Sequence, residues 1–288
     1  MRRCAPRKYT VRVILSTGFP SSLSPLFAVP SVIALLAYLL AAAGDSTWSR
    51  RALPVAWVAH GTAMLVHLFG IGEPGSGARF GFAPALSAAA WLVVAVHAIE
   101  SRFVPLAGAR RSLAVLGGGM VLLALIFPGE DAIHPASPWA PLHWILGIVS
   151  YGLFGAAVLH AVLLDRAERA MRGGQRPAAA AASGGVPLLR LEALTFRFVS
   201  AGFVALTLAV LLGAWFATPW RWDHKTVFSV LGWVVFAALL LGRQVFGWRG
   251  RRATRWLYAG AALLLLAYVG SRFVFEVLLH RVPAGGAG

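Results

Sequence analysis

The stretch RWDHKTVFSVLGWVVFAALLLGR, residues 221–243, joins a short polar sequence to a long apolar run. No charged residue interrupts the run after Lys225 until its last position. A helix needs about 20 mostly apolar residues to span a membrane, and in lipid only helices and closed barrels satisfy their own backbone polar groups. The stretch therefore predicts a transmembrane helix whose polar end carries Trp222, Asp223 and His224.

Similar apolar runs recur along the whole chain. Its 288 residues are 59% hydrophobic and 12% charged, whereas about 25% of residues are charged in soluble domains. The sequence therefore predicts an all-α, polytopic membrane helix bundle with about eight transmembrane helices. The expected spans are residues 24–43, 53–71, 83–100, 112–128, 141–164, 192–217, 225–241 and 256–279.

The spans define one membrane domain, residues 24–281, between a basic N-terminal extension, residues 1–23, and a short tail, residues 282–288. The longest connection, residues 165–191, contains a Gly-Gly pair and an alanine run at 178–182. We expect this connection to be flexible.

The distribution of basic residues predicts the orientation. Of the 26 Lys and Arg residues, 15 lie in the loops after the first, third, fifth and seventh spans, and four lie in the alternate loops and the tail. Basic loops stay in the cytoplasm, so the Trp-Asp-His-Lys loop should face the periplasm of a bacterial inner membrane. The net charge of +16 then reflects membrane orientation, and no nucleic-acid partner is expected.

The N-terminal extension contradicts this orientation, because its five basic residues would also favour the cytoplasm. Two explanations fit. The true start lies downstream of residue 1, or residues 1–43 are a signal peptide with a long basic region.

The sequence gives little support for disulfide formation, covalent haem attachment or enzymatic catalysis. A single cysteine, Cys4, excludes an internal disulfide, and no C-x-x-C-H motif attaches a c-type haem. No nucleophile–base–acid constellation is evident, so we do not expect an enzyme.

Two histidines begin apolar spans on the same side of the membrane. His143 opens the fifth span and His224 opens the seventh, so they lie at one depth. Two imidazoles on opposite faces of a haem make a six-coordinate iron site. Both residues are candidate iron ligands, and the alternative is that they cap or pack the helices.

Further candidate cofactor-binding residues surround this pair. Trp220 and Trp222 offer aromatic faces for a flat ligand, or they form an aromatic belt at the interface. Asp223 either orients its neighbours or caps the seventh helix. Arg272 either neutralises Glu276 four residues later or meets haem propionates.

His60 lies near the middle of the second span. An ionisable residue at that depth is either functional or part of a helix–helix hydrogen bond. Both interpretations remain open for His60.

Four segments together resemble the cytochrome c assembly protein family, and within it the shorter YpjD/HemX-like branch. They are APLHWILGIVSYGLFGAAVL, residues 140–159; residues 221–243; and GWRGRRA, residues 247–253, with YVGSRFVFEVLL, residues 268–279. The resemblance covers nearly the whole chain from about residue 26. The long tryptophan-rich signature of haem-delivering members is reduced here to Trp220-x-Trp222-Asp223.

The resemblance implies a protein that binds haem b without covalent attachment and assists cytochrome c assembly or haem export at the outer face. It implies that His143 is the outer haem ligand and that His224 stands where this branch has a histidine before its lysine. The implied partners are the lipid bilayer, haem, other cytochrome c assembly proteins and an apocytochrome. The alternatives are a non-haem small-molecule transporter and a membrane scaffold subunit.

Overall fold

The computed structural model describes residues 25–71, 79–102, 109–131, 139–183, 185–216 and 222–274. The predicted extension, residues 1–23, and the tail, residues 282–288, lie outside these ranges. Long helices dominate the described residues, which confirms the predicted fold class. They are α1 (Pro25–Ala43), α2 (Thr47–Leu68), α3 (Phe82–Glu100), α4 (Ala109–Ile126), α5 (Ala140–Arg172), α7 (Leu188–Phe216), α8 (His224–Phe246) and α9 (Gly250–Leu265).

Shorter elements complete the fold. The π-helix η1 (Leu266–Gly270) continues α9 into α10 (Ser271–Phe273), and α6 (Arg176–Ala182) lies between α5 and α7. The two-residue strands β1 (Arg79–Phe80) and β2 (Glu130–Asp131) pair antiparallel. This small ribbon joins the α2–α3 and α4–α5 connections, and the sequence did not predict it.

Seven helices in the described ranges are long and apolar enough to span a membrane, counting α9, η1 and α10 as one. The remaining expected span is α2, whose 22 residues give a length of about 33 Å. It is less apolar because it contains Arg50, Arg51, His60 and His67. Composition thus supports seven of the expected spans, and length alone supports α2.

The expectation of a flexible connection at residues 165–191 was wrong. α5 continues to Arg172, and the alanine run forms α6, since alanine has the highest helix propensity. Asp165 fixes the extension of α5 to α9 by accepting hydrogen bonds from Thr254 Oγ1 at 3.0 Å and Tyr258 Oη at 2.9 Å.

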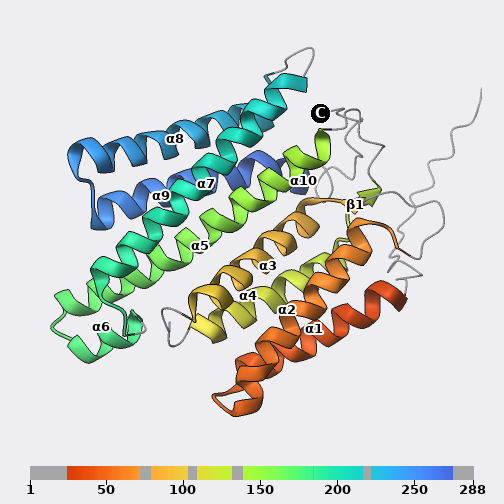
Figure 1. The fold of residues 1–288 in the computed structure, drawn as a ribbon, viewed down its shortest axis with the longest axis horizontal. Coiled ribbons are helices and arrows are strands. Elements are labelled where there is room, and N and C mark those ends of the chain that lie inside the picture. The colour runs from red at the N-terminus through yellow and green to blue at the C-terminus, as the bar shows by residue number, and fades with distance from the viewer. Residues whose placement is uncertain are drawn as a thin grey trace, which may run out of the picture.

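The helices form two groups that α5 connects (Figure 1). α1 to α4 share one buried core, and α5, α7, α8 and α9 share another. In the first group, Trp57 and Trp91 stack at 4.8 Å, and each indole N–H donates to the other residue's carbonyl. In the second group, Phe154 and Phe236 stack at 3.8 Å. These aromatic contacts fix the register between neighbouring helices.

The two ends of the bundle differ in composition. The N-terminal ends of α5 and α8 lie at the end that carries the β1–β2 ribbon, and α6 lies at the opposite end (Figure 1). The opposite end also holds the α1–α2, α3–α4, α5–α7 and α8–α9 connections, which carry arginines either in the connection or in the adjoining helix ends. We call the first the ribbon end and the second the arginine end.

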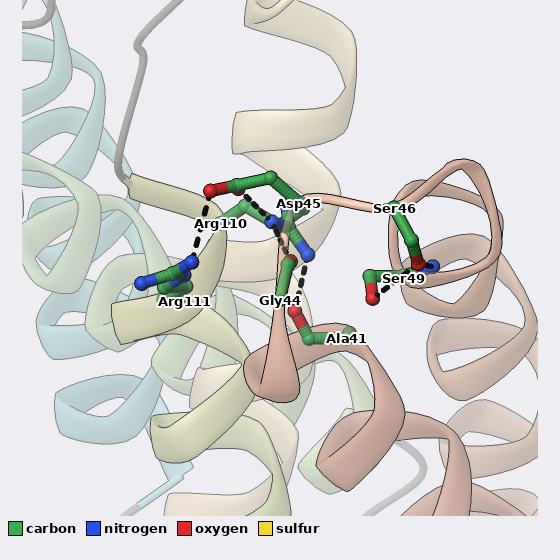
Figure 2. A network of polar contacts seen from close by, with 7 residues as sticks. All are labelled: Ala41, Gly44, Asp45, Ser46, Ser49, Arg110 and Arg111. Atoms are coloured by element: carbon green, nitrogen blue, oxygen red, sulfur yellow. Dashed lines mark hydrogen bonds and ion pairs between the residues drawn. The ribbon is translucent and has the colours of Figure 1, made fainter.

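Figure 2 shows how arginines stabilise the arginine end. The Arg110 guanidinium donates to the carbonyls of Ala41 and Gly44, which the end of α1 leaves without helical partners. Arg110 and Arg111 also pair with Asp45 at 2.6 and 2.9 Å. α4 therefore caps α1 and holds the tight turn into α2.

Candidate functional site at the ribbon end

α7 positions the ring of His143. The ring lies in the first turn of α5, and its Nδ1 donates a hydrogen bond to the Ala209 carbonyl at 2.9 Å. A carbonyl oxygen only accepts, so Nδ1 carries the proton and Nε2 carries the lone pair of the neutral imidazole. Gly213 lies one turn further along α7, and a Cβ there would approach His143 Cε1 to 2.9 Å. The glycine therefore gives the ring the space in which it makes this bond.

α8 begins at the same end with a capped first turn. Asp223 Oδ1 accepts a hydrogen bond from the Thr226 backbone N–H at 2.7 Å, which is the capping role that the sequence left open. Burial acts to raise the pKa of Asp223, but the hydrogen bonds from Thr226 and the charges of Lys225 and His224 outweigh it and lower the pKa below 3.8. Asp223 therefore remains an anion at neutral pH.

Cationic side chains lie close to this end of the second helix group. Lys225 Nζ lies 6.0 Å from the centre of the Tyr268 ring, and Lys225 is close enough to Arg272 and His143 for their charges to interact. Tyr268 belongs to the π-helix η1. Single π turns inside α-helices occur frequently at functional sites.

A hydrogen bond ties this π turn to α5. Tyr151 Oη donates to the carbonyl of Leu264, just before η1. At the other side, Phe273 of α10 meets Phe82 of α3 edge to face at 5.4 Å. The π turn is therefore held between the two helix groups.

Exposed indoles surround the same end. The exposed fractions are 69% for Trp222, 82% for Trp215 and 54% for Trp139. Such faces suit both an interfacial belt and a flat aromatic ligand. The predicted site residue Trp220 lies outside the described residues, as do Arg221 and Glu276, so the proposed Arg272–Glu276 pair stays a prediction.

The structure brings His143, His224 and Arg272 to one end, but it does not bring His60 to them. His60 is buried in the first helix group, where Tyr38 Oη lies 3.1 Å from its Nδ1 and Ser87 Oγ lies 2.7 Å from its Nε2. Both ring nitrogens are therefore used in hydrogen bonds between helices. An iron ligand at His60 would require one of these bonds to break, so the geometry favours the structural interpretation.

A second buried polar cluster lies near the arginine end, and the sequence did not predict it. His160 Nε2 lies 2.9 Å from the Glu100 carboxylate, and His160 Nδ1 donates to the Ala156 carbonyl at 2.7 Å. Both side chains are at least nine-tenths buried, and His97 lies beside them. α3 and α5 enclose His97 and His160, so neither ring is exposed at the surface of the bundle. The i,i+3 spacing of His97 and Glu100 was the available signal.

Comparison with known proteins agrees with the family resemblance seen in the sequence. Residues 26–279 match the family model described as Cytochrome C assembly protein. The cytochrome c biogenesis protein CcsA of Parasynechococcus marenigrum is 27% identical over 63% of this chain and 70% of its own length. The inner membrane protein YpjD of Escherichia coli K12 is 32% identical over 54% of this chain and 60% of its own length, so the chain spans less than two thirds of that relative. No solved structure matches.

Proposed function

We propose that this chain, which belongs to the cytochrome c assembly protein family, binds haem b non-covalently at the ribbon end of its second helix group. Membership of the family supports a role in cytochrome c assembly. In this proposal His143 and His224, the first residue of α8, would hold the haem iron. Haem bound there would serve assembly or export, with an apocytochrome or another assembly protein as the recipient.

The observation that carries the proposal is the hydrogen bond from His143 Nδ1 to the Ala209 carbonyl. Metal-ligating histidines almost always donate their other ring N–H to a carbonyl or carboxylate, which fixes the tautomer and the ring orientation. The bond leaves Nε2 as the basic nitrogen, which is the form that binds iron. The residues present therefore fit a haem ligand at this position.

The surrounding side chains fit the rest of a haem molecule. Lys225 and Arg272 supply positive charge for two propionates. Trp222 supplies an exposed aromatic face. When bound, haem would supply a redox-active iron, and the chain's own part is to hold, orient and charge-balance it.

The charge distribution supports the orientation of this site. Basic loops favour the cytoplasm, and the connections with arginines in them or in the adjoining helix ends lie opposite the start of α5 (Figure 1). We therefore place the haem site on the periplasmic side of an inner membrane. A relative is itself named an inner membrane protein.

A haem titration with chemical rescue tests this proposal. The purified protein in detergent is titrated with haemin, followed by the Soret band, in wild type, His143→Gly and the control His97→Ala at the arginine end. We expect His143→Gly to lose tight binding, added imidazole to restore it, and His97→Ala to bind as wild type. A wild type that binds no haem would refute the proposal and favour a transporter or a scaffold subunit. Equal binding by His143→Gly without imidazole would also refute it.

A further inference from the structure

A groove lies between α3 and α7 near the arginine end, far along the bundle from His143. Its cavity of about 570 Å³ has Glu100 in its lining, apolar walls that include Ile99, Leu194 and Phe198, and the arginines Arg190 and Arg197. This volume falls within the range of about 300–1,000 Å³ that is typical of small-molecule sites. We call it the α3–α7 groove.

The two arginines of the groove lie on one side of α7. They are seven residues apart in α7, so they share a face about 10 Å apart along the helix axis. Both are exposed, and both lie in a helix that is apolar enough to span a membrane. Within the ranges that the structure describes, neither guanidinium group forms an ion pair or hydrogen bond with the protein.

The carboxylates near these arginines have other partners. Glu192 pairs with Arg243 at 3.0 Å, and Glu100 lies 2.9 Å from His160 and is 7% exposed. A guanidinium at the lipid-facing surface of a span is costly unless it meets an anion or reaches the interface. Within the described residues no carboxylate pairs with Arg190 or Arg197, so both guanidinium groups are open to an anion from outside the chain.

We propose that the α3–α7 groove binds an anionic phospholipid of the leaflet at the arginine end. The arginines would bind the headgroup phosphate, since guanidinium groups pair with phosphate oxygens through charge-assisted hydrogen bonds. An acyl chain would lie along Ile99, Leu194 and Phe198, where Ile99 is 64% exposed. Basic pockets between transmembrane helices on the cytoplasmic side bind anionic headgroups in this way. The inference is independent of the haem proposal, because it uses none of the residues at the ribbon end.

The test measures lipid binding by native mass spectrometry of the full chain, with phosphatidylglycerol and phosphatidylcholine supplied at equal concentration. The variant is Arg190→Gln/Arg197→Gln. The control is Arg251→Gln/Arg255→Gln, which removes the same charge from exposed positions of α9 at the same end. We expect wild type and control to prefer phosphatidylglycerol, and the groove variant to bind it about tenfold or more weakly. An equal loss of phosphatidylglycerol binding in both variants, or no preference of the wild type for phosphatidylglycerol over phosphatidylcholine, would overturn the proposal.

Competition experiments distinguish a bound phospholipid from the other candidate occupants of the groove. Displacement of the lipid by millimolar inorganic phosphate would assign the arginines to a free anion, and displacement by haemin would assign the groove to a porphyrin. Either result overturns the lipid proposal, which predicts that neither phosphate nor haemin competes.

Leu194→Trp, which fills the groove without changing charge, should also lose the lipid, whereas Leu208→Trp on an exposed face of α7 should keep it. Retention of the lipid by Leu194→Trp would refute the proposal even if the arginine variant does not fold.

Discussion

Gly213→Ala should weaken haem binding although residue 213 touches no haem atom in our proposal. The added Cβ would lie 2.9 Å from His143 Cε1 and 3.3 Å from Nδ1, which is closer than van der Waals contact allows. The ring must therefore shift and weaken its bond to the Ala209 carbonyl. Losing such a supporting bond typically lowers metal affinity by about 10- to 100-fold.

Gly147→Ala provides the matched control, because residue 147 lies one turn from His143 on α5 and a Cβ there meets nothing within 4 Å. Both substitutions place alanine in a helix, where it gains about 0.5–1 kcal/mol over glycine. Their difference therefore isolates the contact with the His143 ring. The assay is haemin titration followed by the Soret band. Equal affinities for Gly213→Ala and Gly147→Ala would refute the reasoning that α7 positions the ligand.

Three further predictions concern stability, measured by thermal unfolding in detergent. Glu100→Ala should destabilise the fold by about 3–5 kcal/mol, because it leaves His160 buried without its carboxylate partner. An equal loss of stability in the double variant Glu100→Leu/His160→Leu would contradict this reasoning. Gly117→Ala should lower the free energy of unfolding by about 1–3 kcal/mol, since the added Cβ would lie 2.5 Å from a tyrosine ring. Gly119→Ala should not lower it, because a Cβ there meets no atom within 4 Å. Asp223→Ala should cost about 0.5–2 kcal/mol by removing the cap of α8. Because the pKa of Asp223 is lowered below 3.8, the charged cap should act at neutral pH and be lost only as the pH falls below about 4; a loss near pH 6 would contradict this.

The sequence predicted the helices well because each apolar run is long enough to require a span. It missed the continuation of α5 beyond residue 164, since charged residues such as Asp165 and Glu168 end the apolar pattern without ending the helix. It also missed the β1–β2 ribbon, because two residues are too few to show the alternation of a strand.

The contacts around the candidate site residues could be predicted from the sequence only in part. His143 stands out as an imidazole in an apolar helix, but its support is a main-chain carbonyl and a glycine 66 and 70 residues later, on α7. Such contacts depend on the register of α5 against α7, which no spacing in the sequence encodes. The same limit applies to His60 and its partners Tyr38 and Ser87 on two other helices.

The visible spectrum of the purified protein tests the central claim most directly. Our account predicts a Soret band and, after reduction, sharp α and β bands, which are lost in His143→Ala and kept in His97→Ala. A protein that stays colourless after haem is supplied during expression, or bands that survive His143→Ala unchanged, would contradict it.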